Sequence, residues 1–183
     1  RSFSNTWRIE NPEFVNFYNI DEIDVNEIFE QNMIDVVINT ATKYGRQGEN
    51  VDELIEANYL FPLKIFKNSI NNNVKSFINT HTVLPKYLNA HSLTKNHFTD
   101  WLKFYSNELT IFNLKLEYLY GEKDSETQFI PYIITSLLKN IEKIDLTEGT
   151  QERNFIYVED VVEAYKRVIL KHDDYNKGFY EYE

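Results

Sequence analysis

Short β-branched runs that alternate with longer amphipathic segments constrain this chain more than any other feature. The run from Ile34 to Asn39 is almost continuously apolar, which is typical of a strand covered on both faces in a parallel sheet. Residues 51–71 and 92–107 instead carry apolar side chains at helical spacing. Strands that alternate with helices predict a layered α/β fold with a mainly parallel sheet.

The same patterns assign the remaining elements. Strands are predicted at residues 14–18, 34–39, 74–80, 112–120 and 155–158, and helices at residues 25–31, 51–71, 92–107, 130–141 and 161–170. Pro62 either kinks the second of these helices or marks where it begins.

Composition excludes several classes of partner and site. A net charge of −10, without a basic stripe, argues against binding to nucleic acid. The chain has no cysteine and only four scattered histidines, so we expect neither disulfides nor a metal site. Its apolar runs are too short to cross a bilayer and no signal sequence is evident, which predicts a cytoplasmic protein without a membrane partner. Because it begins at Arg1, we expect it to be a piece of a longer polypeptide.

The segment Asn-Ala-His-Ser-Leu-Thr-Lys at residues 89–95 places His91 and Lys95 on one face of a helix. It resembles the Asn-x-Tyr-Ser-x-x-Lys motif of the extended short-chain dehydrogenase/reductases, specifically the nucleotide-sugar epimerases and dehydratases. His91 occupies the position of the tyrosine. The resemblance implies that Lys95 holds the nicotinamide ribose and that His91 stands in the proton-transfer position. Taken alone, a His/Lys pair more often belongs to a solvated face of a helix than to a catalytic site. The catalytic interpretation therefore depends on other family segments occurring in the same order along the chain.

Residues 77–83 resemble the family strand that ends in a short Ser/Thr cluster. The resemblance implies that Thr82 bonds the reacting sugar oxygen as a catalytic residue, and that Thr80 lines the same rim and binds substrate. A hydroxyl can donate to a developing oxyanion or accept from an alcohol. Val83 and Leu84 replace the Asp-Glu pair of the sugar 4,6-dehydratases, which disfavours elimination by that pair.

Residues 149–161 resemble the family pattern Gly-x-x-x-Arg-Asp-Phe-x-x-Val-x-Asp-Val. The resemblance implies that Arg153 grips the nucleotide diphosphate, for which its planar fork is suited. Gln151 and Phe129 are assigned to substrate binding on the same basis. Residues 114–121 resemble Leu-Arg-x-x-Asn-x-Tyr-Gly, with Tyr118 in place of the asparagine.

Three further residues are assigned to the cofactor, NAD or NADP. Thr40 and Ala41 follow a strand and resemble the segment that passes along the cofactor ribose, while Asp21 takes the place of the carboxylate that meets the adenine amine. The family's Gly-x-x-Gly-x-x-Gly sequence, which cradles the pyrophosphate, does not occur in these 183 residues. We therefore expect this chain alone to bind NAD(P) poorly.

Together these observations predict a Rossmann-like, doubly wound parallel sheet that lacks the first βαβ unit. Residues 1–120 would form an incomplete cofactor-binding domain, and residues 121–183 a partial substrate-binding region whose last helix returns to the core. The resemblance implies an NAD(P)-dependent nucleotide-sugar epimerase, reductase or dehydratase, closest to the enzymes that make CDP-activated dideoxysugars for surface polysaccharide. It would form a homodimer through the helices of residues 51–71 and 92–107.

Two alternatives remain open. A catalytically impaired nucleotide-sugar-binding protein of the same fold would explain His91 and the missing glycine sequence. An unrelated acidic interaction domain would require all the ordered matches to arise by chance.

Overall fold

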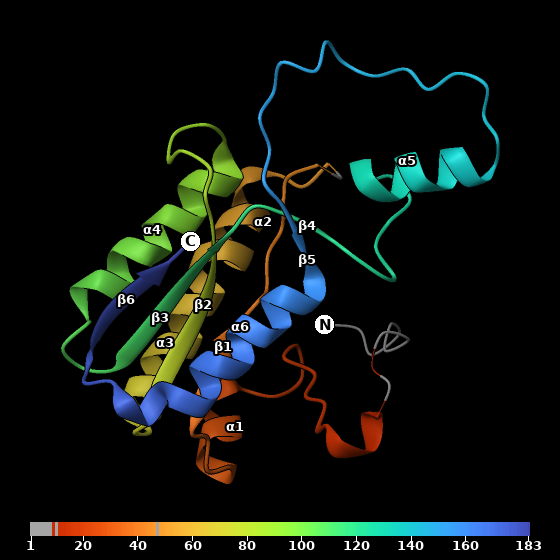
Figure 1. The fold of residues 1–183 in the computed structure, drawn as a ribbon. Helices are drawn as coiled ribbons and strands as arrows, with labels where there is room; N and C mark the ends of the chain where they lie inside the picture. Colours follow the sequence, from red (N-terminus) through yellow and green to blue (C-terminus); the bar gives the residue numbers. More distant parts are fainter. Residues whose placement is uncertain (1–8, 10, 47) are drawn as a thin grey trace.

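A computed structural model of the chain describes residue 9, residues 11–46 and residues 48–183. Its main sheet has four parallel strands in the order β1-β2-β3-β6 (Figure 1). These strands are β1 Val36–Asn39, β2 Ser76–Thr82, β3 Thr110–Leu116 and β6 Gly178–Tyr182. Because all four run in the same direction, their carboxyl ends meet at one edge of the sheet.

Helices cover both faces of this sheet, as expected for a doubly wound fold (Figure 1). On one face lie α1 Val25–Gln31, α3 Phe61–Asn71 and α4 Ala90–Phe104, and on the other lies α6 Val158–Lys171. The predicted Rossmann-like α/β class is therefore confirmed.

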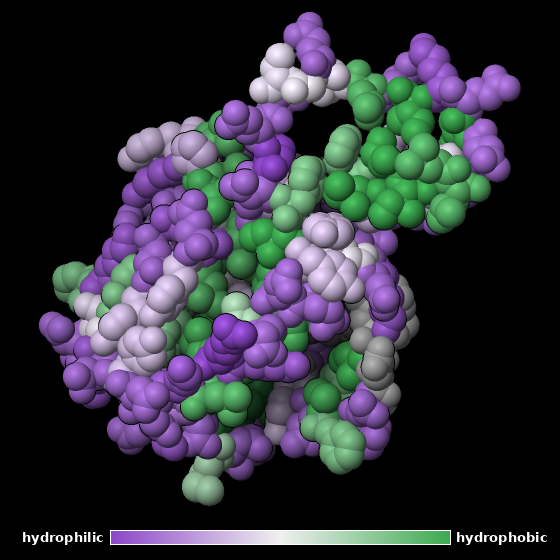
Figure 2. Space-filling view, in the orientation of Figure 1, coloured by the Kyte–Doolittle hydropathy of each residue, from purple (hydrophilic) through white to green (hydrophobic). Residues whose placement is uncertain are grey.

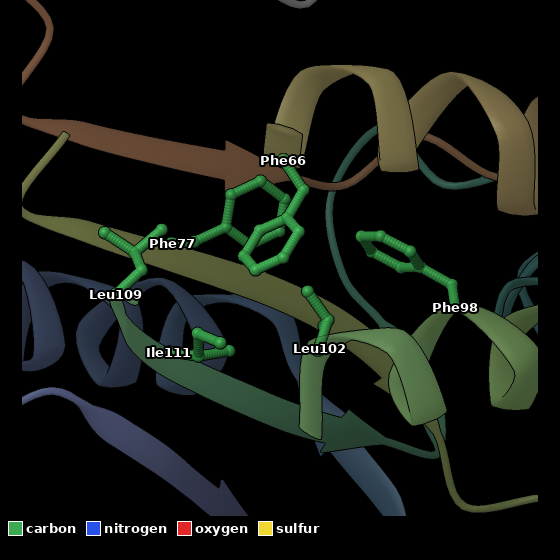
Figure 3. Close-up of a cluster of buried hydrophobic side chains, with 6 residues drawn as sticks. All are labelled: Phe66, Phe77, Phe98, Leu102, Leu109 and Ile111. Carbon is green, nitrogen blue, oxygen red and sulfur yellow. The ribbon is translucent and has the colours of Figure 1, made fainter. Parts of the chain in front are cut away.

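Each face has its own apolar core, because successive residues of a strand point to opposite sides. Phe77 of β2 packs edge to face against Phe66 of α3, with ring centroids 5.1 Å apart, and Phe98 of α4 completes the cluster (Figure 3). On the opposite face, the neighbouring residue Ile78 packs with Phe112 against α6. These two layers fix the sheet between α4 and α6.

The helix predicted over residues 51–71 is continuous, and Pro62 neither breaks nor begins it. It consists of α2 Val51–Ile55, a π-helical turn η2 Glu56–Leu60, and α3. Within the wider turn, the N–H of Phe61 donates to the carbonyl of Glu56, five residues back. This wider turn ends two residues before Pro62, which has no N–H and whose ring crowds the preceding helical turn.

A smaller, two-stranded parallel sheet is formed by β4 Tyr118–Tyr120 and β5 Phe155–Tyr157. The strand predicted over residues 112–120 is therefore two strands, interrupted at Glu117. Between β4 and β5 the chain extends away from the main sheet and carries α5 Phe129–Leu138 (Figure 1). Large apolar side chains gather on this extension (Figure 2), and those that are exposed are Phe129, Tyr132, Ile134, Leu137, Leu138, Ile141 and Leu146.

Two expectations about strands are wrong, and one strand was not expected. Residues 14–18 form no strand: Pro12–Phe14 is a 3₁₀ turn, and no described strand lies alongside the extended residues that follow. β1 is covered less completely than expected, since Ile38 is 43% exposed at the edge of the sheet. β6 was not predicted at all, although it pairs along its length with β3.

Among the described residues, no helix has both the length and the apolar character that a membrane span requires.

Candidate functional site

The first turn of α4 is fixed by a capping box. The backbone N–H of Ser92 donates to the Asn89 side chain at 2.8 Å, and the N–H of Asn89 donates to the Ser92 hydroxyl at 3.2 Å. These bonds satisfy two backbone donors that a helix start leaves free. His91 and Lys95 then follow one turn apart and are both buried, with 6% and 7% of their surfaces exposed.

Burial changes the protonation of this pair. It lowers the pKa of Lys95 to about 8. The pKa of His91 is lowered to about 4, first by burial and then by the positive charges of Lys95 and Arg46. At neutral pH the site thus holds a neutral imidazole beside a buried ammonium group, and no ion pair is recorded for that ammonium among the described residues.

A buried amide, Asn58, ties the loop after β1 to this turn of α4. Its side chain accepts from the N–H of Lys43 and donates to the carbonyl of Lys43, both at 2.8 Å. It also donates to the hydroxyl of Thr94 at 3.2 Å, between His91 and Lys95. Asn58 lies in the π-helical turn and was not predicted; a polar residue four positions before Pro62 was the only signal available.

Tyr44, also not predicted, lies against His91. The two ring centroids are 5.0 Å apart, with an angle of 34° between the ring planes. The guanidinium carbon of Arg46 lies 5.7 Å from the Tyr44 centroid. Gly45 adopts a φ of +72° between them, a backbone conformation that favours glycine.

The two threonines of β2 have different surroundings. Thr82 is half-buried at the carboxyl end of the strand, and its hydroxyl accepts from the N–H of Leu84 at 3.2 Å. The hydroxyl of Thr80 instead shares a 2.5 Å hydrogen bond with the hydroxyl of Tyr165 of α6. The hydroxyl of Thr82 therefore donates to no residue that the structure describes, whereas that of Thr80 is bonded to Tyr165 beneath α6.

Between these threonines, His81 points to the α4 face. Its Nδ1 lies 3.4 Å from the hydroxyl of Thr99, which donates to the carbonyl of Lys95 at 3.1 Å. The pKa of His81 is lowered to about 4, first by burial and then by the positive charge of Lys95. This contact brings the end of β2 and the Lys95 turn together.

A ladder of side-chain hydrogen bonds crosses all four strands beside His81. Asn39 donates to Asn79 at 2.9 Å, Asn79 donates to Asn113 at 2.8 Å, and Asn113 donates to Glu181 at 2.8 Å. Lys115 lies 3.0 Å from the other carboxylate oxygen of Glu181. Burial alone would raise the pKa of Glu181, but the bonds from Lys115 and Asn113 outweigh it and lower that pKa.

Unlike Lys95, the three further residues assigned to the cofactor are exposed. Thr40 and Ala41 directly follow β1 and precede Lys43, which Asn58 holds. Asp21 lies in a turn after residue 19, where its N–H donates to the Asn19 side chain at 3.2 Å. No recorded contact joins Asp21 to Lys95 among the described residues.

The residues assigned to the substrate lie on and around the small sheet. The guanidinium carbon of Arg153 lies 5.3 Å from the ring centroid of Tyr118, and its Nη1 donates to the carbonyl of Glu152 at 2.7 Å. Phe129 stacks on Phe155 with centroids 5.8 Å apart. The side chain of Gln151 accepts from Thr147. No recorded contact in the described part of the chain joins this group to His91 or Lys95.

Comparisons with known proteins identify the family. The model of the NAD dependent epimerase/dehydratase family matches residues 1–180. A CDP-abequose synthase of Salmonella muenchen is 34% identical over 170 residues, which cover 87% of this chain and 57% of that protein. The enzyme of the same name from Salmonella typhimurium strain LT2 is 32% identical over 91% of this chain and 58% of its own length. The chain therefore spans less than two thirds of these relatives.

Solved structures show the same fold. MoeE5 in complex with UDP-glucuronic acid and NAD superposes with a TM-score of 0.72 at 19% identity, over 91% of this chain and 60% of that one. A UDP-N-acetylglucosamine 4-epimerase from Methanobrevibacter ruminantium M1 gives a TM-score of 0.73 at 21% identity, over 90% and 59% of the two chains. With the family model matching almost every residue, the chain belongs to the NAD-dependent epimerase/dehydratase family.

Proposed function

We propose that this chain is the core of an NAD(P)-dependent enzyme that transfers hydride at a carbon of a nucleotide sugar. The observation that carries the proposal is the buried Lys95, held one turn after His91 at the carboxyl end of β2. A buried ammonium without a recorded ion pair among the described residues is costly for stability, and such costs are concentrated at functional sites. Family membership supplies the reaction class.

In this proposal Thr82 orients the sugar hydroxyl, His91 stands at the proton-transfer position and Arg153 holds the diphosphate. Thr80, Gln151 and Phe129 line the substrate region. The hydroxyl proton of Thr82, which is donated to no described residue, suits an oxygen that gains negative charge during the reaction. The exposed guanidinium of Arg153 has further N–H donors for phosphate oxygens.

The residues around α4 fit a nicotinamide cofactor. Lys95 would hold the nicotinamide ribose, while Thr40, Ala41 and Asp21 would follow the adenosine half. A nicotinamide accepts or supplies hydride when bound. The chain's own contribution is to keep the Lys95 ammonium buried away from water and fixed next to the reacting centre.

The substrate we propose is a CDP-linked deoxysugar, of the kind used for surface polysaccharide. Two relatives named CDP-abequose synthase support this choice over a UDP-linked or dTDP-linked sugar. Val83 and Leu84 stand where an elimination would need an acid and a base, so epimerisation or ketone reduction is favoured over dehydration.

Cofactor turnover in the intact polypeptide tests this function. Purified protein would be mixed with a CDP-linked ketosugar and NADPH or NADH, and the absorbance of the reduced cofactor followed in a single turnover. We expect a decrease that requires the sugar and that is lost in Lys95→Met. Tight binding of the sugar nucleotide without any turnover would contradict an enzyme.

That outcome would favour the second candidate, an impaired protein that binds nucleotide sugars. The imidazole at position 91, with its low pKa, is the observation that favours it. Restoring tyrosine with His91→Tyr should raise turnover if the position is the one assigned. No change would refute that assignment.

A homodimer through the continuous helix of residues 51–71 and through α4 is also proposed. Trp101 and Phe104 of α4 are 38% and 73% exposed, which provides an apolar surface for a second copy. Sedimentation of the intact polypeptide would show a dimer, and Phe104→Glu should weaken it.

A further inference from the structure

We propose that the hydroxyl of Tyr44 transfers the proton in this site and replaces the phenol that position 91 lacks. This inference rests on the proposed function, since it needs hydride transfer at a sugar carbon. It concerns a residue from the loop after β1, far in sequence from His91, which the fold brings against the first turn of α4.

Two features on either side of Tyr44 hold it in place. Before it, Lys43 has both its N–H and its carbonyl bonded by the buried side chain of Asn58. After it, Gly45 turns the chain at a φ of +72°, and a Cβ there would meet Leu54 at 3.2 Å. The backbone is thus fixed at both neighbours, which limits the directions in which the ring can point.

The ring of Tyr44 then lies beside the imidazole that occupies the usual proton-transfer position, with centroids 5.0 Å apart. Asn58 also bonds Thr94, so one buried amide sets the loop and the helix turn relative to each other. The phenol ring therefore lies against the helical turn that carries His91, one turn before Lys95.

The polar end of Tyr44 is available to a ligand. The side chain is 57% exposed, and its hydroxyl makes no hydrogen bond among the residues that the structure describes. Arg46, 5.7 Å from the ring centroid, adds a positive charge on the same loop.

Atoms and electrons balance in this step with the sugar carbonyl, the reduced nicotinamide and water as the reactants. In the direction of reduction, a hydride with its electron pair arrives at the carbonyl carbon from the reduced nicotinamide, and the C–O double bond becomes single. The O–H bond of Tyr44 breaks, its proton goes to the sugar oxygen, and the phenolate recovers a proton from water at its exposed edge. The sugar is reduced and the nicotinamide oxidised by one electron pair.

His91 is less suited to the same step. It is almost buried, at 6% exposure, whereas Tyr44 reaches solvent. With its pKa near 4, the neutral imidazole also holds its last proton far more tightly than a phenol does. His91 is therefore a positioning residue, whose ring supports that of Tyr44.

Tyr44→Phe in the intact polypeptide tests the proposal, because it removes only the hydroxyl and keeps the ring contact. With a CDP-linked ketosugar and reduced cofactor, we expect kcat to fall by roughly 100- to 10,000-fold, with KM within about threefold of the original. Adding His91→Tyr to Tyr44→Phe should restore at least a tenth of the original rate, since a phenol returns to the cluster.

Tyr87→Phe is the matched control: Tyr87 is another exposed tyrosine next to a cation, Lys86. It should keep kcat within about twofold. If the unmodified protein is active and Tyr44→Phe keeps its rate, the role of Tyr44 is refuted while the enzyme function stands. If the unmodified protein binds the sugar nucleotide without turnover, the enzyme function and the role of Tyr44 are both refuted. This outcome is distinguishable because turnover is then absent before any substitution is made.

Discussion

Lys95 is the residue at which stability and the proposed activity are opposed. Its side chain is buried, and its positive charge acts on His91 one turn earlier. Removing a charge from water without an opposite charge destabilises a folded protein. A site that holds an anionic or polar ligand can retain such a charge because the ligand completes its surroundings.

Replacing Lys95 with methionine should therefore stabilise the chain. We expect the free energy of unfolding in urea at pH 7 to rise by about 1 to 3 kcal/mol. The pKa of Lys95 is about 8 when folded and about 10.5 when unfolded, so the charge penalty applies below pH 8 and fades as the pH rises toward 10.5. The advantage of Lys95→Met should shrink over that range.

Lys86→Met is the control for this substitution. Lys86 lies 2.7 Å from Asp100 and is partly exposed, so its loss should cost less than about 1 kcal/mol. Destabilisation by Lys95→Met would show that the ammonium has partners that stabilise the fold.

His81 should make the fold sensitive to acid. Its pKa is about 4 in the folded chain and about 6.5 when unfolded, so the unfolded state binds the extra proton between these values. Stability is therefore greatest above pH 6.5 and falls as the pH drops toward 4, by up to about 1.4 kcal/mol per pH unit. Thr99, Lys95, Lys115, Lys103 and Glu181 are the groups around it.

Urea unfolding at pH 7, 6 and 5 measures this effect. In His81→Leu the free energy of unfolding should fall less steeply with decreasing pH than in the original chain. The difference should be a substantial part of the 1.4 kcal/mol per pH unit, to within about a factor of two. His97→Leu, at an exposed position of α4, should leave the slope unchanged. Equal slopes for the original chain and His81→Leu would show that protonated His81 is accommodated in the fold.

At the scale of the strands, the amide ladder sets the alignment of the sheet. The same four positions that are bonded through side chains are also partners in the backbone register, Asn39 with Asn79, Asn79 with Asn113, and Asn113 with Glu181. A shift of any strand by one residue would turn its amide to the α6 face and leave its neighbours buried without a partner.

Asn113→Leu should break this ladder in the middle. The amide of Asn79 and one oxygen of Glu181 then lose their partner, and we expect a loss of about 2 to 4 kcal/mol in the free energy of unfolding. The double variant Asn79→Leu/Asn113→Leu should lose less than the sum of the two single variants, because the second change removes an amide already left unpaired.

Asn71→Leu, at an exposed position of α3, should change stability by less than about 0.5 kcal/mol. If the double variant instead loses as much stability as the two single variants together, Asn79 and Asn113 act independently.

The local patterns predicted the helices well, and the long-range contacts not at all. α1 was predicted with the bounds that it has, since the apolar spacing that indicated it is a local signal. β6 was missed because its strand character comes from pairing with β3, more than sixty residues earlier. Asn58 and Tyr44 were missed for the same reason: their partners, Lys43, Thr94 and His91, become neighbours only in the folded chain.

For the whole molecule, we expect weak binding of NAD(P) to these 183 residues by themselves. Lys95, Thr40, Ala41 and Asp21 would contact the ribose and adenine parts, but no Gly-x-x-Gly-x-x-Gly sequence is present to bind the pyrophosphate through backbone N–H groups. Calorimetric titration should show little or no heat at micromolar concentrations. The intact polypeptide, titrated in parallel, should bind, whereas tight stoichiometric binding by the 183 residues would contradict this expectation.

The order of strands has a consequence for synthesis on the ribosome. β3 lies in the middle of the sheet, yet one of its two neighbours, β6, is translated only after α5 and α6. At ordinary elongation rates that interval lasts roughly 3 to 12 seconds. During it, Asn113 and the outer edge of β3 are available to any other extended peptide in the crowded cell, so chaperone protection would matter most in that window.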